Sequence, residues 1–204
     1  MDASPGHYVD SQAATSQTAC WAGSYNPSAN STTSSDCIEA SSGHYVPSSG
    51  SATQTACNPG TYQPNTGQSS CLDADAGNYV AGLGATTQTA CASGTYQSLG
   101  GQASCITTPP GNYSSSGAVS AIPASTGHYV ASSGSDSETA CAPGTYQPNT
   151  GQTSCITTDA GNYSGSGASS QTPCALGTYQ PLAGQSSCLI ADCHHYVDTT
   201  GAIA

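Results

Sequence analysis

Apolar residues in this chain occur singly or in very short runs, and no window has the 3.6-residue period of an amphipathic helix. The aromatic residue that recurs is tyrosine, at the third position of a repeated Gly-x-Tyr motif. A glycine followed by a small polar residue and tyrosine is typical of a turn that leads into a short extended segment. The pattern therefore predicts short strands joined by turns, in which tyrosine supplies most of the apolar contact and keeps its hydroxyl near water.

The motif returns at an interval of 17 residues, with one interval of 20 and a few of 16. Internal repeats of such a short period indicate an array of small structural units. Eleven copies begin with glycine, from Gly6 to Gly177, and a twelfth begins with His194. We expect the twelve tyrosines to be the repeated aromatic residue of the units: Tyr8, Tyr25, Tyr45, Tyr62, Tyr79, Tyr96, Tyr113, Tyr129, Tyr146, Tyr163, Tyr179 and Tyr196.

Two kinds of unit alternate. One begins G-[HN]-Y and ends near Q-T-A-C, as in GHYVPSSGSATQTAC from Gly43, and the other has the form G-T-Y-Q-P-x-x-G-Q-x-S-C. The sequence predicts a mainly β or irregular fold, an elongated tandem array of disulfide-stapled, hairpin-like units, with a β-solenoid of one unit per rung as the alternative. The expected divisions are 1–5 (tail of a split unit), 6–110 (six units), 111–126 (a unit without cysteine), 127–193 (four units) and 194–204 (head of a split unit).

The cysteine spacing favours one pairing. The unit from Gly111 to Thr126 has no cysteine, and Ala124 stands where one is expected. If each cysteine pairs across the shorter, 14-residue gap, this unit can be inserted without depriving any cysteine of its partner; the other choice would join Cys105 to Cys141 across it. Each loop of about 15 residues contributes roughly 3 kcal/mol in the chain-entropy model. The predicted disulfides are Cys20–Cys37, Cys57–Cys71, Cys91–Cys105, Cys141–Cys155 and Cys174–Cys188, with Cys193 unpaired or bonded to another chain.

The amino-acid composition excludes several classes of function. The 204 residues include no Lys or Arg and eleven acidic residues, so the net charge is −11. This excludes binding to nucleic acids, anionic membranes or phosphate ligands, all of which depend on basic side chains. Phe is absent and Met and Trp occur once each, too few for one large core and therefore for a compact enzyme domain. Regular cysteines indicate an oxidising compartment and an extracellular or cell-surface location.

The motif C-x2-G-T-Y-x4-G-x3-C occurs at Cys57, Cys91, Cys141 and Cys174, and with three extra residues at Cys20. It resembles the cysteine-rich repeats of ephrin-receptor-like and tumour-necrosis-factor-receptor-like extracellular proteins. The resemblance implies an elongated disulfide ladder with little regular structure. The chain departs from that family where G-[HN]-Y units replace a second cysteine soon after the first pair. A ligand-binding surface is not part of the motif, so receptor function does not follow from it.

The two ends complement each other in sequence. HHYVDTTGAIA at the C-terminus followed by MDASP from the N-terminus aligns with the unit GNYSSSGAVSAIPAST. We expect the N-terminus of one molecule to complete the last unit of another, or the 204 residues to be one period of a longer array; both give a linear polymer. The alternative is that both ends are arbitrary limits. No signal peptide or transmembrane segment is recognisable, so we expect a mature or excised part of a longer precursor.

Neither a metal nor a cofactor is predicted. His7, His44, His128 and His195 share a position with Asn78, Asn112 and Asn162, which suits a polar turn residue better than a ligand. His194 and His195 beside Cys193 are too few for a zinc site. Asp73 and Asp75 resemble the start of a calcium loop but are not periodic, so a structural turn is favoured and Ca²⁺ stays weakly supported. No credible catalytic triad is present, and no enzyme activity is expected.

Three sites have the N-x-[ST] sequence of N-glycosylation, at Asn30, Asn112 and Asn162. Runs rich in Ser and Thr, such as 31–35, 114–116 and 132–137, suit O-linked sugars. The sequence therefore predicts an extracellular structural protein that polymerises head to tail, with itself as partner, into a glycosylated fibril or cell-surface appendage. The alternatives are the stalk or ligand-binding ectodomain of a receptor or adhesin and, with less support, a calcium-dependent adhesin.

Overall fold

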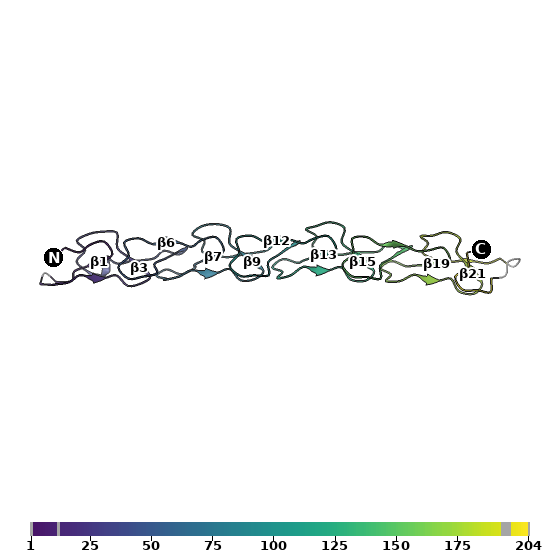
Figure 1. Cartoon of the computed structure of the whole chain (residues 1–204), viewed down its shortest axis with the longest axis horizontal. Helices are drawn as coiled ribbons and strands as arrows, with labels where there is room; N and C mark the ends of the chain where they lie inside the picture. Colours follow the sequence, from purple (N-terminus) through teal and green to yellow (C-terminus); the bar gives the residue numbers. More distant parts are fainter. Residues whose placement is uncertain (1, 12, 193–196, 204) are drawn as a thin grey trace. The chain divides into compact units, whose positions relative to one another are not determined.

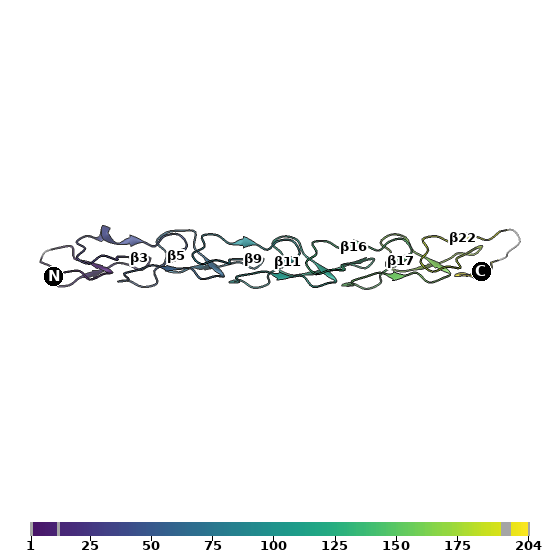
Figure 2. The same ribbon diagram turned by 90° about the horizontal axis from the view of Figure 1, so that it is seen from above.

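The computed structural model of the chain describes residues 2–11, 13–192 and 197–203. Among these residues the regular structure consists of two-residue strands and one 3-10 helix, η1 (Ser34–Asp36). The chain forms two compact units, of which the first comprises Met1–Cys91 and Gln97–Cys105 and the second Ala92–Tyr96 and Ile106–Ala204. Within each unit the hairpins follow one another in chain order (Figures 1 and 2).

Every strand pairs antiparallel with one other strand to form a hairpin. The eleven hairpins of the described residues, numbered along the chain, are β1–β2 (His7–Tyr8, Thr18–Ala19), β3–β4 (Ser24–Tyr25, Ile38–Glu39), β5–β6 (His44–Tyr45, Thr55–Ala56), β7–β8 (Thr61–Tyr62, Leu72–Asp73), β9–β10 (Asn78–Tyr79, Thr89–Ala90), β11–β12 (Thr95–Tyr96, Ile106–Thr107), β13–β14 (Asn112–Tyr113, Ile122–Pro123), β15–β16 (His128–Tyr129, Thr139–Ala140), β17–β18 (Thr145–Tyr146, Ile156–Thr157), β19–β20 (Asn162–Tyr163, Thr172–Pro173) and β21–β22 (Thr178–Tyr179, Leu189–Ile190). Each Gly-x-Tyr motif supplies the first strand, so the predicted tandem array of hairpins is confirmed. The described strands form no β-solenoid, which was the alternative.

Two kinds of backbone hydrogen bond join each hairpin to the next one along the chain. In the first unit, the N–H of Gly6 donates to the carbonyl of Asn26 at 2.7 Å, and the N–H of Val9 donates to Ser31 at 2.9 Å. In the second unit, Gly127 and Val130 make the same two bonds to Gln147 and Gln152. The donors are the opening glycine and the residue after the tyrosine, so the bonds depend on position in the repeat and not on side-chain identity.

A third bond skips one hairpin. The N–H of Gly50, in the loop of hairpin 3, donates at 2.8 Å to the carbonyl of Cys20, the last residue of hairpin 1. In the second unit Gly167 donates in the same way to Cys141. Each hairpin within a unit is therefore held by the next hairpin and by the one after it, an arrangement typical of quasi-one-dimensional repeat proteins.

The third contact explains two glycines in each repeat. Loop glycines such as Gly50 and Gly84 have a φ of 77° and 65°, in the left-handed region that disfavours residues with a Cβ. The opening glycine also has a positive φ, and a Cβ on Gly43 would overlap the carbonyl oxygen of Gly84. Glycine is thus required where the loop of one hairpin lies against the start of the hairpin two places before it.

Small residues form the buried interior. One position is the residue directly after the second strand, which we call the end residue; it is buried in hairpins 1 to 10 and half-buried in hairpin 11. In hairpins 1 to 11 it is Cys20, Ala40, Cys57, Ala74, Cys91, Thr108, Ala124, Cys141, Thr158, Cys174 or Ala191. The other is the residue after the tyrosine, such as Val46 or Gln63. The eleven described tyrosines are half-buried and lie beside this interior. Tyr196 lies outside the described residues.

Candidate functional site

One position decides how each hairpin is closed. This closing position lies three residues before the end residue. In hairpins 2, 4, 6, 9 and 11 it holds Cys37, Cys71, Cys105, Cys155 and Cys188, and in hairpins 1, 3, 5, 8 and 10 it holds Gln17, Gln54, Gln88, Glu138 and Gln171. Hairpin 7 has Ala121 there. In the ten hairpins other than hairpin 7, the closing residue bonds to the short segment before the first strand of its own hairpin, either by a disulfide or by a polar side chain.

In the disulfide-closed hairpins the closing cysteine is bonded to the end residue of the preceding hairpin. The five disulfides of the structure are the pairs that the cysteine spacing predicts, with Cα–Cα distances of 5.6–5.8 Å. In four of these hairpins a buried glutamine follows the tyrosine. The amide nitrogen of Gln63, for example, donates to the carbonyl of Ser70 at 2.8 Å, and its amide oxygen accepts from the N–H of Asn65. The disulfide and this amide together hold the loop.

In the side-chain-closed hairpins the closing Gln or Glu accepts a hydrogen bond from a backbone N–H. The donor is the residue after the preceding end residue, as in Ser41 N–H to Gln54 Oε1 at 2.7 Å and Asp75 N–H to Gln88 Oε1 at 2.7 Å. The five hairpins of this class make this bond at 2.7–2.9 Å. Sequence reasoning noted the Q-T-A-C ending but missed the role of its glutamine. Alignment of the units on the end residue would have found it, since Gln then falls in the cysteine column.

Glu138 makes the same closure with a carboxylate. It accepts hydrogen bonds from the N–H and the hydroxyl of Ser125, at 2.7 and 2.6 Å, and lies 3.8 Å from Nδ1 of His128. Burial raises the pKa of this carboxyl, but the bonds from Ser125 and the charge of His128 outweigh it, so the pKa of Glu138 lies below its ordinary value. Ser125 donates to Glu138 and not to the histidine, so these three residues act as a closure and not as a nucleophile with its base.

Hairpin 7 has neither closure. Its closing residue, Ala121, has no polar atom in the side chain. The residue that would donate is Pro109, which has no N–H, and the preceding end residue is Thr108 in place of cysteine. Ala124, which the sequence marks as a missing cysteine, is the fully buried end residue of this hairpin. The following hairpin, hairpin 8, is closed by Glu138.

The histidines predicted to be turn residues lie in first strands. Nδ1 of His7, His44 and His128 lies 3.2–3.3 Å from the carbonyl two residues earlier, a bond made by the Nδ1-protonated ring. At the same position Asn78, Asn112 and Asn162 donate their amide N–H to the carbonyl two residues earlier. Histidine and asparagine can thus replace each other at this position of the repeat, because both make the same local hydrogen bond.

The acidic candidates also have local roles. Asp75 accepts a hydrogen bond from the amide of Gln88 at 2.6 Å, while Asp73 belongs to strand β8. Among residues 2–11, 13–192 and 197–203, no group of three or more His, Cys, Asp or Glu side chains is placed to hold a metal ion. Cys193, His194 and His195 lie outside the described residues. Within the same residues no helix is long and apolar enough to span a membrane.

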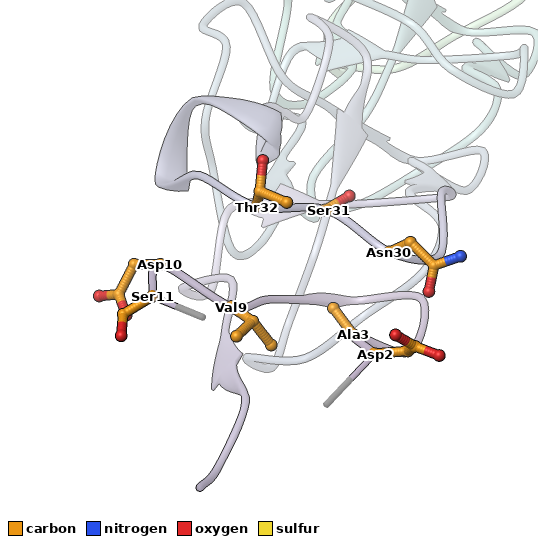
Figure 3. Close-up of a pocket in the computed structure, with 8 residues that line it drawn as sticks. All are labelled: Asp2, Ala3, Val9, Asp10, Ser11, Asn30, Ser31 and Thr32. Carbon is orange, nitrogen blue, oxygen red and sulfur yellow. The ribbon is translucent and has the colours of Figure 1, made fainter. Parts of the chain in front are cut away.

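A pocket of about 480 Å³ lies in the first unit beside hairpin 1 (Figure 3). Its lining comes from the N-terminal segment, from the residues after β1 and from the loop of hairpin 2: Asp2, Ala3, Val9, Asp10, Ser11, Asn30, Ser31 and Thr32. Ala3 corresponds to an end residue. Its carbonyl accepts a hydrogen bond from the N–H of Asn30, just as the carbonyl of the end residue Cys20 accepts one from the N–H of Gly50. We call this site the end pocket.

Comparison with known proteins supports the predicted resemblance. The family described as tyrosine-protein kinase ephrin type A/B receptor-like matches residues 43–91 and 161–203. The chain resembles ephrin-receptor-like cysteine-rich repeats. The matched segments contain the disulfides Cys57–Cys71 and Cys174–Cys188. Ephrin-receptor-like repeats are typically extracellular and generally non-enzymatic, and disulfides of this density belong to oxidising compartments. A search of curated proteins finds no match to the chain.

Proposed function

We propose that the chain is a structural segment of an extracellular protein, an array of closed hairpins that copies extend end to end into a glycosylated fibril or cell-surface appendage. The observation that carries this proposal is the repeated hydrogen-bonding rule. Each hairpin offers the same donors and acceptors to its successors, whatever its side chains are. A contact that one hairpin makes to the next within a chain is available to a hairpin of another chain, and such a contact does not close on itself.

The end pocket supports addition at one end. In later hairpins the carbonyl after the tyrosine accepts the N–H of the preceding hairpin's opening glycine, as Asn26 does from Gly6. Val9 occupies this position in hairpin 1, and its carbonyl accepts no backbone hydrogen bond from the residues that the structure describes. Val9 lines the end pocket. The preferred occupant of the pocket is therefore the first strand of one more hairpin, supplied by a second copy.

Val197 supports addition at the other end. Its carbonyl accepts the N–H of Gly177 at 3.1 Å, as expected for the residue after a tyrosine. Its N–H corresponds to that of Val130, which donates to the loop of the following hairpin, but Val197 donates to no residue of the described part of the chain. An incoming hairpin would accept this bond.

Sedimentation velocity and electron microscopy of the full chain, with its disulfides formed, test the proposal. Val197→Pro removes the N–H and keeps the carbonyl, so it should shorten or abolish filaments, while Val197→Ala should leave them unchanged. Filaments with a regular axial repeat in the wild type and the Ala variant support end-to-end addition. A monomer at every concentration, or filaments of equal length in the Pro variant, would contradict it.

A ligand-binding ectodomain or stalk is the second candidate, and two observations favour it. The first is the family match. The second is a series of apolar residues at one repeat position, directly across the strand pair from tyrosine, with exposed fractions of 44–47%: Ile38, Leu72, Ile106, Ile122, Ile156 and Leu189. A protein ligand that covers these residues would slow hydrogen exchange in the strands that carry them. A stable monomer that captures such a ligand would favour this candidate over the fibril.

A further inference from the structure

We infer that Asn30 is the asparagine of this chain that carries an N-linked oligosaccharide, and that Asn112 and Asn162 remain unmodified in the folded protein. The three asparagines share the N-x-[ST] sequence but occupy different places in the repeat. Asn30 lies in the loop of hairpin 2, whereas Asn112 and Asn162 lie in strands β13 and β19. This inference does not depend on the proposed end-to-end addition.

Asn30 replaces a loop glycine. Its N–H donates to Ala3 at 2.8 Å, the bond that loop glycines make elsewhere, and its φ of 61° lies in the left-handed region. Asparagine tolerates this conformation better than most residues with a Cβ. The side chain of Asn30 is exposed, and its amide makes no hydrogen bond to the residues that the structure describes. The amide nitrogen is therefore available to accept a sugar without loss of an internal contact.

The residues after Asn30 expose the hydroxyl that the sequon requires. Ser31 is buried, and its hydroxyl accepts a hydrogen bond from the amide of Asn26 at 2.8 Å. This contact fixes Ser31 inward, and both Asn30 and Thr32 are exposed. The carboxylate of Asp36 accepts the N–H of Thr32 at 3.0 Å, so η1 holds the segment in this orientation. The loop of hairpin 2 thus presents an accessible sequon.

The other two sequons are turned into the fold. Ser114 and Ser164 are 0% and 2% exposed, and their hydroxyls donate to the carbonyls of Thr95 and Thr145 at 3.0 and 3.1 Å. The half-buried amides of Asn112 and Asn162 donate to the carbonyls two residues earlier. An oligosaccharide on either amide nitrogen would replace one of its two hydrogens and crowd a half-buried side chain in a paired strand, and the serine hydroxyl of the sequon is buried, so the folded hairpin opposes the modification.

Figure 3 shows the direction that a sugar would take. The amide nitrogen of Asn30 points to the outer side of the end pocket, away from Val9 and Ser31. A sugar on this nitrogen would extend into solvent and leave the wall formed by Val9 uncovered. Modification of Asn30 is therefore compatible with a hairpin in the end pocket.

The transfer requires a lipid-pyrophosphate-linked oligosaccharide as donor and the transferase that uses it. The amide nitrogen of Asn30 bonds to the anomeric carbon of the first sugar, and the bond from that carbon to the pyrophosphate oxygen breaks. The lipid pyrophosphate leaves with the bonding electrons, and the amide loses one proton to a base of the transferase. The product is a neutral N-linked sugar, so the acidic chain gains mass without a change in charge.

Glycopeptide mass spectrometry of the full chain, secreted from a eukaryotic host, tests the inference. Trypsin has no cleavage site because the chain has no Lys or Arg, so chymotrypsin and Glu-C are used. Only protein with all five disulfides intact is analysed, which restricts the result to folded molecules. A sugar on Asn30, with Asn112 and Asn162 unmodified, is the expected result. Unmodified Asn30, or a sugar on Asn112 or Asn162 in this protein, would overturn the inference.

Two variants separate the modification from the loop structure. Asn30→Gly restores the glycine of the other loops, and Thr32→Val removes only the hydroxyl of the sequon. Both should lose the entire N-linked glycan mass and keep all five disulfides. The control Asn112→Gln should keep the glycan mass of the wild type, and loss of that mass in the control would contradict the inference.

Discussion

Hairpins 7 and 9 share one backbone and differ in how they are closed. Hairpin 9 has the disulfide Cys141–Cys155, and the buried amide of Gln147 bonds to Ser154 in its loop at 2.8 Å. Hairpin 7 has Ala121 at the closing position and Ser114 in place of the buried glutamine. Both nonetheless have the same strand pairing and the same bonds to later hairpins. The comparison teaches that the closure is not needed for the hairpin shape, and we expect the closing residue to set how strongly each hairpin resists opening.

The largest expected effect comes from removal of a disulfide. Cys141→Ala with Cys155→Ala should destabilise hairpin 9 by roughly 3 kcal/mol, because its 14-residue loop is no longer cross-linked in the open state. Ala40 and Ala124 are already buried end residues, so alanine fits this position. The measured loss of stability should therefore reflect the disulfide and not a large new cavity. Hydrogen exchange of peptides from 144–158 should accelerate. Unchanged exchange there would show that the disulfide does not control opening.

The reverse experiment gives hairpin 7 a disulfide. Thr108 and Ala121 occupy the positions that cysteines hold in hairpin 9, so Thr108→Cys with Ala121→Cys should form a bond and slow exchange over 111–124. The increase in the free energy of unfolding of hairpin 7 should be somewhat below 3 kcal/mol, because the buried hydrogen bond from the Thr108 hydroxyl to the Gly94 carbonyl is lost. Non-reducing mass spectrometry checks the bond, with each single variant as control. Free thiols in the double variant would mean that the two positions are not equivalent.

Loss of a side-chain closure should have a smaller effect. Gln54→Ala removes the acceptor for the N–H of Ser41 and should destabilise hairpin 3 by about 1 kcal/mol, the usual net value of one hydrogen bond. Gln68→Ala is the matched control, because the amide of Gln68 bonds only locally, to the carbonyl of Thr66. Hydrogen exchange of peptides within 43–57 should rise in the first variant alone. Equal exchange in both variants would count against a closing role for Gln54.

The smallest effect concerns pH. Since the pKa of Glu138 is lower in the folded state than in the unfolded one, its closure is fully present above the ordinary glutamate pKa. It is lost as the pH falls through the folded pKa. Nδ1 of His128 lies 3.8 Å from this carboxylate. Exchange of hairpin 8 should therefore rise in acid in the wild type and not in Glu138→Gln. The same rise in both would refute the assignment.

Local features of the fold could be predicted from the sequence because each depends on a few neighbouring residues. Gly-x-Tyr marks every first strand, and the cysteine spacing around the insertion at Gly111 gives all five pairs found in the structure. The backbone hydrogen bonds between hairpins could not be predicted, because they leave no side-chain pattern. Only the glycines of the loops hint at them, through the close approach of Gly43 to Gly84.

The candidate sites were predicted less completely. The three sequons look alike in sequence, yet Ser114 and Ser164 are buried by contacts to the preceding hairpin, and only Asn30 is exposed. Tyrosine was expected to provide most of the apolar contact; the described tyrosines are half-buried, and the fully buried apolar positions hold alanine, cysteine and valine. The closing glutamines were missed because their partner is a backbone N–H.

Hydrogen exchange of the unmodified, oxidised chain tests the central claim most directly, namely that the closing residue decides the stability of each hairpin. The second-strand amides of hairpin 7, within residues 111–124, should exchange fastest, those of hairpins 8 and 10 more slowly, and those of hairpin 9 slowest. Reduction should bring hairpin 9 close to hairpin 7 and leave hairpins 8 and 10 almost unchanged. Equal protection in all four hairpins before reduction would contradict the account.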